Sequence, residues 1–334
     1  MIIVRTPFRI SFFGGGTDYP AWYNNNKGAV ISTTINKFCY ITCRPLPPFF
    51  NYNYRIRYHK KEEVMRINQI EHPSVKACLK DRNIKEGLEI VHHADLPARS
   101  GLGSSSTFTV GMLHALYTLQ GKMISKRELA NSAINIEQNV IKENVGSQDQ
   151  TNAAFGGFNH IEFLPGDKIV VEPIILAKNK IDMLRSHIML FFTGFSRTAS
   201  DVSLHQIDAI KRGTINLSQS YELVQEAKNI LQKSNFIDSF GKLLHEQWLM
   251  KRGFTTKITN KKIDDIYAAG IKSGAIGGKL LGAGGGGFML FIAKPKHHSR
   301  IRKALKKLLY VPVDLETLGS QIIYYSNNTE NAEN

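Results

Sequence analysis

The stretch ARSGLGSSSTF, residues 98–108, decides how the rest of the chain is interpreted. It joins a strand-like segment, GLEIVHHADLP (87–97), to a helix-like segment, STFTVGMLHALYTLQG (106–121). In a strand–loop–helix unit of this kind, glycines let the backbone approach an anion while free N–H groups at the helix start point outward. The loop therefore predicts a phosphate site, with a serine-capped turn as the alternative. No lysine follows the last glycine, so the common nucleotide-loop pattern is absent.

Glu137 is the second informative residue. Ser125 and Glu128 form a capping-box signature that predicts a helix over SKRELANSAINIEQNVIKEN, residues 125–144. Apolar residues at helical spacing place Glu137 on the inward-facing stripe of that helix. A buried carboxylate is stable only when it is paired or metal-bound. Near a phosphate loop it suits Mg²⁺, and a satisfied internal contact is the alternative.

Two further segments carry candidate polar groups. Asp149 stands in the loop NVGSQDQTNAAFGG, residues 144–157, where it is either a turn former or a general base for a substrate hydroxyl. The segment RTPFRISFFGGGTDYP, residues 5–20, places Arg9 on a strand before a glycine bend. The bend carries Asp18 beside other polar groups and suits a polyol, with a simple hairpin turn as the alternative.

The overall composition limits the classes of partner. The formal charge of +15 indicates anionic partners. Lysine and arginine are dispersed until KPKHHSRIRKALKK, residues 294–307, and no aromatic RNA-binding motif is present, so we expect no nucleic-acid partner. No apolar run approaches the length needed to span a membrane, so we expect no membrane partner. The three cysteines form no CxxC pair, which favours a reducing, cytoplasmic compartment. The eleven histidines show no metal-ligand spacing.

The order of the expected elements indicates an α+β protein. Strand signals dominate the first half, whereas two long helical stretches, roughly residues 200–233 and 235–253, dominate the second. We therefore expect two domains, 1–180 and 181–326, which share a cleft. The last residues, 327–334, have the composition of a disordered tail.

Three glycine-containing segments in this order resemble those of the GHMP kinase superfamily. The first is PFRISFFGGGTDYP (7–20), the second LPARSGLGSSSTF (96–108) and the third KLLGAGGGGF (279–288). The resemblance implies a ribosomal-S5-like N-terminal domain and a ferredoxin-like C-terminal domain. Within the superfamily, the segments QDQTNAAFGGFN (148–159) and FFTGFSRTAS (191–200) look most like those of bacterial D-glycero-D-manno-heptose 7-phosphate kinases.

The resemblance also implies roles for individual residues. Asp149 matches the general base, Arg9 matches the arginine beside it, and Ser105 and Glu137 match the Mg²⁺ ligands. The ATP-binding residues implied by the match are Arg99, Ser100, Gly101, Leu102, Gly103, Ser104, Ser105 and Ser106. The substrate-binding residues that it implies or that we infer are Arg9, Gly15, Gly16, Thr17, Asp18, Tyr19, Arg197, Gly284 and Gly285.

One position departs from the family pattern. Members usually have alanine after the two serines of the central loop, whereas Ser106 and Thr107 stand here. We expect little effect, although the extra hydroxyl could alter the Mg²⁺ or phosphate contacts. Arg197 is expected to hold the phosphate of the acceptor sugar, since arginine binds phosphate with two parallel hydrogen bonds. A surface arginine with no such role is the alternative.

The resemblance implies an ATP- and Mg²⁺-dependent kinase that phosphorylates the anomeric hydroxyl of heptose 7-phosphate. The product would be the 1,7-bisphosphate used for GDP-heptose and surface polysaccharide. Two alternatives stay open, a fucokinase- or galactokinase-like sugar-1-kinase and a non-catalytic sugar-sensing paralogue. The expected partners are a sugar phosphate and ATP, and the sequence leaves room for a homodimer.

Overall fold

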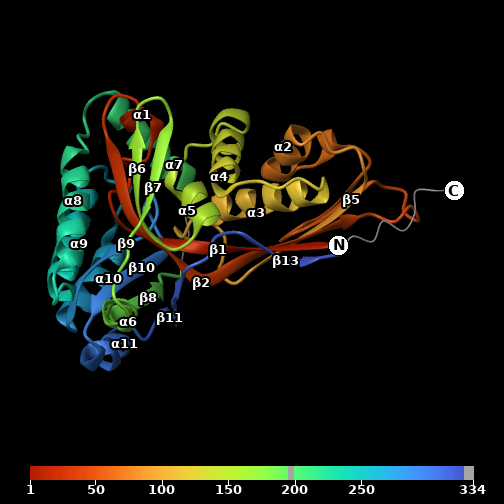
Figure 1. Cartoon of the computed structure of the whole chain (residues 1–334). Helices are drawn as coiled ribbons and strands as arrows, with labels where there is room; N and C mark the ends of the chain where they lie inside the picture. Colours follow the sequence, from red (N-terminus) through yellow and green to blue (C-terminus); the bar gives the residue numbers. More distant parts are fainter. Residues whose placement is uncertain (195–198, 327–334) are drawn as a thin grey trace.

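The computed structural model describes residues 1–194 and 199–326, which form two β-sheets with helices packed against them (Figure 1). The larger sheet has the strand order β13-β1-β2-β5-β3-β4, with β12 and β6 pairing with β2 and β7 pairing with β6. The smaller sheet has the order β11-β8-β10-β9. Two sheets, each covered by its own helices, make an α+β architecture, as the sequence predicted.

The strands have the following bounds: β1 (Ile2–Phe13), β2 (Gly28–Pro45), β3 (Tyr54–Arg57), β4 (Lys61–Val64), β5 (Leu88–Ala94), β6 (Phe158–Leu164), β7 (Lys168–Pro173), β8 (Ile188–Phe192), β9 (Ala275–Leu280), β10 (Phe288–Ala293), β11 (Leu309–Val311), β12 (Leu315–Glu316) and β13 (Gln321–Tyr325).

The helices have the following bounds: α1 (Pro20–Tyr23), α2 (Pro73–Asp81), α3 (Ser104–Leu119), α4 (Lys126–Asn135), α5 (Gln148–Phe155), α6 (Lys178–His187), α7 (Ala199–Lys211), α8 (Ser218–Gln232), α9 (Ile237–Arg252), α10 (Lys261–Lys272) and α11 (His298–Ala304). Short helical turns are η1 (Ile67–Gln69), η2 (Ile136–Val140) and η3 (Pro295–His297). Within the described ranges, no helix is both long enough and apolar enough to cross a bilayer.

β1 and β2 form the central pair of the larger sheet. They are antiparallel along most of β1, from Ile2 opposite Cys43 to Phe13 opposite Ile31. The long β2 then pairs with β6 through its first half and with β5 through its second half. Helices α2, α3, α4 and α5 lie along one side of this sheet (Figure 1). These strands therefore carry the first glycine bend, after β1, and the central loop, after β5, on a common frame.

The end of the chain differs from the expected division at residue 180. β12 pairs with β2 and β13 pairs with β1, so residues 315–325 return to the larger sheet. The expected helical stretch 200–233 is also two helices, α7 and α8, because residues 212–217 break it and Gly213 has a positive φ of 70°. The second sheet is packed against α9 and α10, and α8 contacts β1 and β2.

Candidate active site

The loop between β5 and α3 has the backbone that the sequence predicted for an anion site. Gly101 has φ +82° and Gly103 has φ +79°, conformations that favour glycine. A Cβ on Gly101 would lie 2.4 Å from the carbonyl oxygen of Leu281, and one on Gly103 would lie 3.3 Å from the Asp149 carboxylate. The helix α3 begins at Ser104, so its first backbone N–H groups have no partner within the helix. The N-terminus of α3 therefore offers the N–H donors that the predicted phosphate site needs, and residues 98–106 are called the phosphate loop below for that prediction.

The side chains of this loop divide into structural and open ones. Leu102 is fully buried and its carbonyl accepts a hydrogen bond from the Arg9 N–H at 3.2 Å. The buried Ser100 accepts one through its carbonyl from the Phe288 N–H, also at 3.2 Å. Arg99 and Ser105 are exposed, and Ser104 Oγ accepts a hydrogen bond from the Arg99 N–H at 3.0 Å. Only part of the expected ATP-binding set is thus open at the surface.

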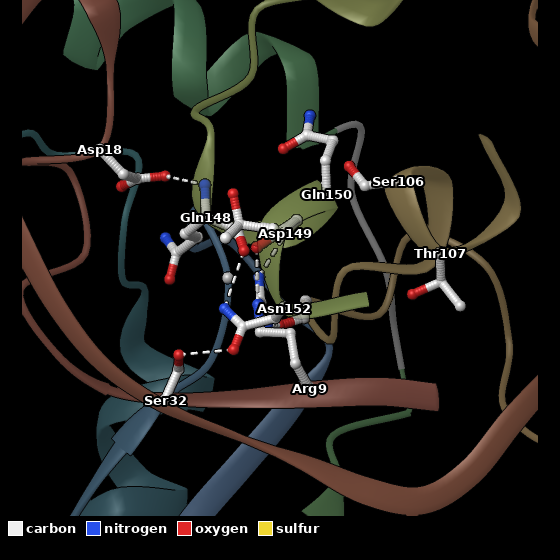
Figure 2. Close-up of polar contacts among 12 residues, drawn as sticks. Arg9, Asp18, Ser32, Ser106, Thr107, Gln148, Asp149, Gln150 and Asn152 are labelled. Carbon is white, nitrogen blue, oxygen red and sulfur yellow. Dashed lines mark hydrogen bonds and ion pairs between the residues drawn. The ribbon is translucent and has the colours of Figure 1, made fainter. Parts of the chain in front are cut away.

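Arg9 and Asp149 form a two-point ion pair across 140 residues of sequence (Figure 2). Arg9 Nε donates to Asp149 Oδ1 at 2.6 Å, and Arg9 Nη2 donates to Asp149 Oδ2 at 2.8 Å. Arg9 Nη1 also donates to the carbonyl oxygen of Gly101 at 2.8 Å. The Arg9 side chain is 5% exposed, whereas that of Asp149 is 25% exposed. Arg9 therefore fixes a partly open carboxylate beside the phosphate loop, as a bidentate guanidinium can.

Asp18 lies next to the segment that carries Asp149. Its carboxylate accepts hydrogen bonds from the Gly16 N–H at 2.9 Å and from the Gln148 N–H at 3.4 Å (Figure 2). Burial raises the pKa of Asp18, and the nearby charge of Asp149 raises it further. A Cβ on Gly146 would lie 1.9 Å from Asp18 Oδ2, so only glycine fits there.

The other residues of the first glycine bend have different surroundings. Thr17 is fully buried, and its hydroxyl donates to the carbonyl oxygens of Gly14 and Ala29 within the bend. The structure thus gives Thr17, which was expected among the substrate-binding residues, hydrogen bonds within the bend. Tyr19 is 7% exposed and donates its hydroxyl to Ser203 Oγ of α7 at 3.1 Å. Gly15 and Gly16 have more space, with no atom closer than 3.5 Å to a Cβ built on either.

Glu137 is buried, as the helical pattern predicted, and its carboxylate accepts hydrogen bonds from side chains of α3 and α5. It is fully buried in η2 and accepts hydrogen bonds from Ser106 Oγ at 2.7 Å, Thr109 Oγ1 at 2.8 Å and Gln150 Nε2. Burial raises the pKa of Glu137 to about 7, against the opposing effect of these hydrogen bonds. We expected the extra hydroxyl of Ser106 to have little effect, but it donates a hydrogen bond directly to the Glu137 carboxylate.

Ser105 lies beside a second carboxylate, Glu143, which the sequence interpretation missed. Burial raises the pKa of Glu143, while a hydrogen bond with Ser105 and the charge of Arg99 act in the opposite direction. The charge of Glu143 in turn contributes to the raised pKa of Glu137. The only sequence signal for Glu143 was its position between Glu137 and Asp149.

The third glycine segment packs against the phosphate loop through its ends. A Cβ on Gly282 would lie 2.4 Å from Gly101 Cα, and one on Gly287 would lie 2.2 Å from the Ser100 carbonyl oxygen. Gly284 and Gly285 contact Ile258, to whose carbonyl the Gly285 N–H donates at 2.9 Å. The structure shows this contact with Ile258, and the expected contact of the two glycines with substrate stays a prediction. Arg197 lies outside the described residues.

Three polar residues of the second domain also reach this region and were missed from the sequence. On α9, Gln247 Oε1 accepts a hydrogen bond from the Gly14 N–H at 3.2 Å, and Lys251 Nζ donates to the Gly282 carbonyl. On β9, Lys279 Nζ donates to the Phe12 carbonyl at 2.9 Å. For Gln247 and Lys279, the available signal was a polar residue next to apolar ones, and Lys251 carried no signal that set it apart from the other lysines of this basic chain.

Comparison with known proteins defines the class of this chain. The models of the GHMP kinases N terminal domain and the GHMP kinases C terminal domain match residues 68–157 and 225–311, together more than half of the chain. The chain belongs to the GHMP kinase family, and the predicted two-domain GHMP fold is confirmed. It is an ATP-dependent sugar kinase.

Individual members of the family are similar to this chain along nearly its whole length. The chain is 28% identical over 324 residues to D-glycero-alpha-D-manno-heptose 7-phosphate kinase of Campylobacter jejuni, covering 92% of this chain and 93% of that protein. It is 23% identical over 334 residues to galactokinase of Thermotoga neapolitana, covering 91% and 92%. A crystal structure of D-glycero-D-manno-heptose 1-phosphate kinase from Bacteroides thetaiotaomicron superimposes with a TM-score of 0.77 at 23% identity, covering 98% of this chain and all of that one.

Proposed function

We propose that the protein transfers the γ-phosphoryl group of ATP to the anomeric hydroxyl of D-glycero-D-manno-heptose 7-phosphate. The observation that carries the kinase chemistry is the Asp149 carboxylate, held by Arg9 beside the phosphate loop and next to Asp18. The heptose assignment is supported by the similarity to the Campylobacter jejuni enzyme along nearly the whole chain. The product, the 1,7-bisphosphate, would serve GDP-heptose and surface polysaccharide synthesis.

The proposed transfer needs a positioned base and charge stabilisation more than covalent catalysis. Asp149 accepts the proton of the anomeric hydroxyl as the new oxygen–phosphorus bond forms, and the bond from the γ-phosphorus to the β,γ-bridging oxygen breaks to release ADP. Arg9 orients Asp149 and stabilises negative charge on the transferring group. Asp18 accepts a hydrogen bond from another sugar hydroxyl, and the N–H groups at the start of α3 bind phosphate oxygens.

The oxygen-rich surroundings of the phosphate loop suit Mg²⁺. Ser105 and Glu143 offer a hydroxyl and a carboxylate beside the helix N-terminus, the ligand type that Mg²⁺ prefers. The buried Glu137 lies within the electrostatic reach of Glu143, and it would exchange hydrogen bonds from α3 and α5 for the ion. Among the described residues, no cluster of three or more histidine, cysteine or acidic side chains forms a metal site of its own. Ser105 and Glu137 are the proposed ligands, and Mg²⁺ would supply charge neutralisation there.

Replacing Glu137 by glutamine tests its link to the metal. We expect the Mg²⁺ concentration for half-maximal activity to rise at least about 10-fold, since changes around a metal ligand typically weaken binding by that amount. Ser106→Ala removes one hydrogen bond to Glu137 and leaves the carboxylate, so it should shift the Mg²⁺ requirement less. Activity should be titrated with Mg²⁺ at fixed ATP, and Mn²⁺ binding measured by electron paramagnetic resonance. An unchanged metal affinity in Glu137→Gln would remove this residue from the metal site.

The acceptor itself is tested by ADP release over a panel of sugars. We expect heptose 7-phosphate to give a kcat/KM at least about 100-fold above fucose, galactose and unphosphorylated heptose, because a site built for a charged group rejects analogues that leave it unpaired. A preference for fucose or galactose would favour the alternative sugar-1-kinase function. That alternative is supported by the 28% identity over 281 residues to L-fucokinase/L-fucose-1-P guanylyltransferase of Bacteroides fragilis. The match covers 77% of this chain and 28% of that protein. Absence of ADP release with every sugar would favour the non-catalytic alternative.

The proposed setting of the reaction is the cytoplasm. The reaction consumes ATP, and Cys39, Cys43 and Cys78 are all free and buried. Free thiols of this kind are typical of a reducing compartment.

A further inference from the structure

Two lysines of the second domain are buried where the glycine segments meet. Lys251 on α9 is 6% exposed, and Lys279 on β9 is 3% exposed. Each has a neutral backbone carbonyl as its hydrogen-bond acceptor, that of Gly282 for Lys251 and that of Phe12 for Lys279. Neither forms an ion pair with a described carboxylate. Buried ammonium groups are normally paired with an acid, so this pair requires an explanation.

The acidic groups nearby are already engaged. Asp149 accepts two hydrogen bonds from Arg9, and Asp18 accepts them from the backbone N–H groups of Gly16 and Gln148. Burial lowers the pKa of Lys251 to about 8, the charge of Arg9 lowers it as well, and Asp18 opposes them. Burial also lowers the pKa of Lys279 well below its usual range, with repulsion from Lys251 next. A bound anion would relieve this repulsion and stabilise both ammonium groups.

The location of the two lysines indicates which reactant would carry such an anion. Gly282, the partner of Lys251, packs directly on Gly101 of the phosphate loop. Phe12, the partner of Lys279, lies two residues before the bend at Gly14. Gln247, one turn before Lys251 on α9, binds the Gly14 N–H. The lysines thus lie between the bend that carries Asp18 and the loop that carries the nucleotide phosphates in the proposed function.

We propose that Lys251, supported by Lys279, binds a phosphoryl group in the acceptor half of the active site. This inference rests on the proposed function, in which the acceptor carries a phosphate. The sequence analysis expected Arg197 to bind that phosphate, and Lys251 and Lys279 are further candidates for the same contact. Two sources share this chemistry, the phosphate of the acceptor sugar and the phosphoryl group in transfer. In either case a compact ammonium group supplies the charge.

The test uses the full chain and measures binding without turnover. Inorganic phosphate is titrated by calorimetry into the protein saturated with Mg²⁺ and either ADP or a non-hydrolysable ATP analogue. Lys251→Met should weaken phosphate binding at least about 10-fold, because it removes a charge-assisted hydrogen bond to the anion. Lys251→Arg keeps the charge and should retain most of the affinity. Lys242→Met, an exposed position on the same helix, is the matched control and should bind phosphate as the unchanged protein does.

The two nucleotide states distinguish the sources of the phosphoryl group. Binding that depends on Lys251 with the ATP analogue in place assigns the site to the acceptor phosphate, because the γ-position is then filled. Dependence that is seen only with ADP assigns the site to the transferring group. Equal phosphate affinity of Lys251→Met and the unchanged protein, with both folded by circular dichroism, would overturn the proposal. These results do not depend on which sugar is phosphorylated, so failure of the heptose assignment in the ADP-release panel is recognised separately.

Discussion

Replacing Asp149 by asparagine should lower kcat by about 100- to 10,000-fold, the range that a positioned general base contributes. Asparagine has nearly the same shape but cannot accept the proton of the sugar hydroxyl. Asparagine can still accept one hydrogen bond from Arg9, so the backbone conformation between Gly146 and α5 should not change. Nucleotide affinity should change little, because the start of α3 and not Asp149 provides the phosphate N–H groups. Steady-state kinetics and calorimetric titration with an ATP analogue measure the two quantities.

The control for this change is Asp182→Asn on the surface of α6, where the side chain is 45% exposed and pairs with Lys178. That variant should have normal kcat. If Asp149→Asn turned over at a rate within a few-fold of the unchanged protein, Asp149 would have no role as the base. The kinase chemistry would then need another proton acceptor.

Replacing Arg9 by methionine should lower kcat by about 100-fold or more, in line with the loss of one electrostatic stabiliser of a transition state. The same change should destabilise the fold by on the order of 1 kcal/mol or more, because it removes the buried partner of a partly exposed carboxylate. Arg9 is almost fully buried and makes three hydrogen bonds, two to Asp149 and one to Gly101. Kinetics at a temperature well below the melting transition separate the two effects.

Arg9→Lys separates charge from geometry. Lysine keeps the positive charge but cannot reproduce the two parallel hydrogen bonds. The kcat of Arg9→Lys should therefore lie between that of Arg9→Met and that of the unchanged protein. Arg57→Met, at an exposed position on β3, is the surface control and should change neither kcat nor the melting temperature. An Arg9→Met enzyme with normal kcat would show that Asp149 works without its ion pair.

Local sequence patterns predicted the parts of the site that depend on neighbouring residues. The glycines and serines of residues 98–108 predicted a loop before a helix, and Gly101 and Gly103 have the positive φ angles that such a loop uses. The helical spacing placed Glu137 inward, and it is fully buried. Both features follow from the periodicity and conformational freedom of single segments.

Contacts between distant segments were harder to predict. The helical pattern of residues 125–144 placed Glu137 inward. It could not show that the hydrogen-bond donors to Glu137 are Ser106, Thr109 and Gln150, because these residues lie on α3 and α5. Thr17 was placed among the substrate-binding residues, yet its hydroxyl bonds to backbone carbonyls within the tight bend. In each case the deciding factor is how two segments pack, which a single-segment pattern does not contain.

The second domain illustrates the same limit. Lys251 and Lys279 looked like ordinary charged residues of a basic chain, and their burial arises only where α9 and β9 meet the bend after β1. The return of β12 and β13 to the larger sheet was also missed, because strand pairing over more than 250 residues leaves no local pattern.

The most direct test of the proposed function is the structure of the product formed from ATP and D-glycero-D-manno-heptose 7-phosphate. Phosphorus and proton nuclear magnetic resonance should show a second phosphorus atom coupled to the proton on carbon 1, while the phosphate on carbon 7 stays in place. In the linear phase of the reaction, Asp149→Asn should give about one-hundredth of this product or less in the same time. A new phosphate on any other carbon, or no new phosphate at all, would contradict anomeric phosphorylation of this sugar.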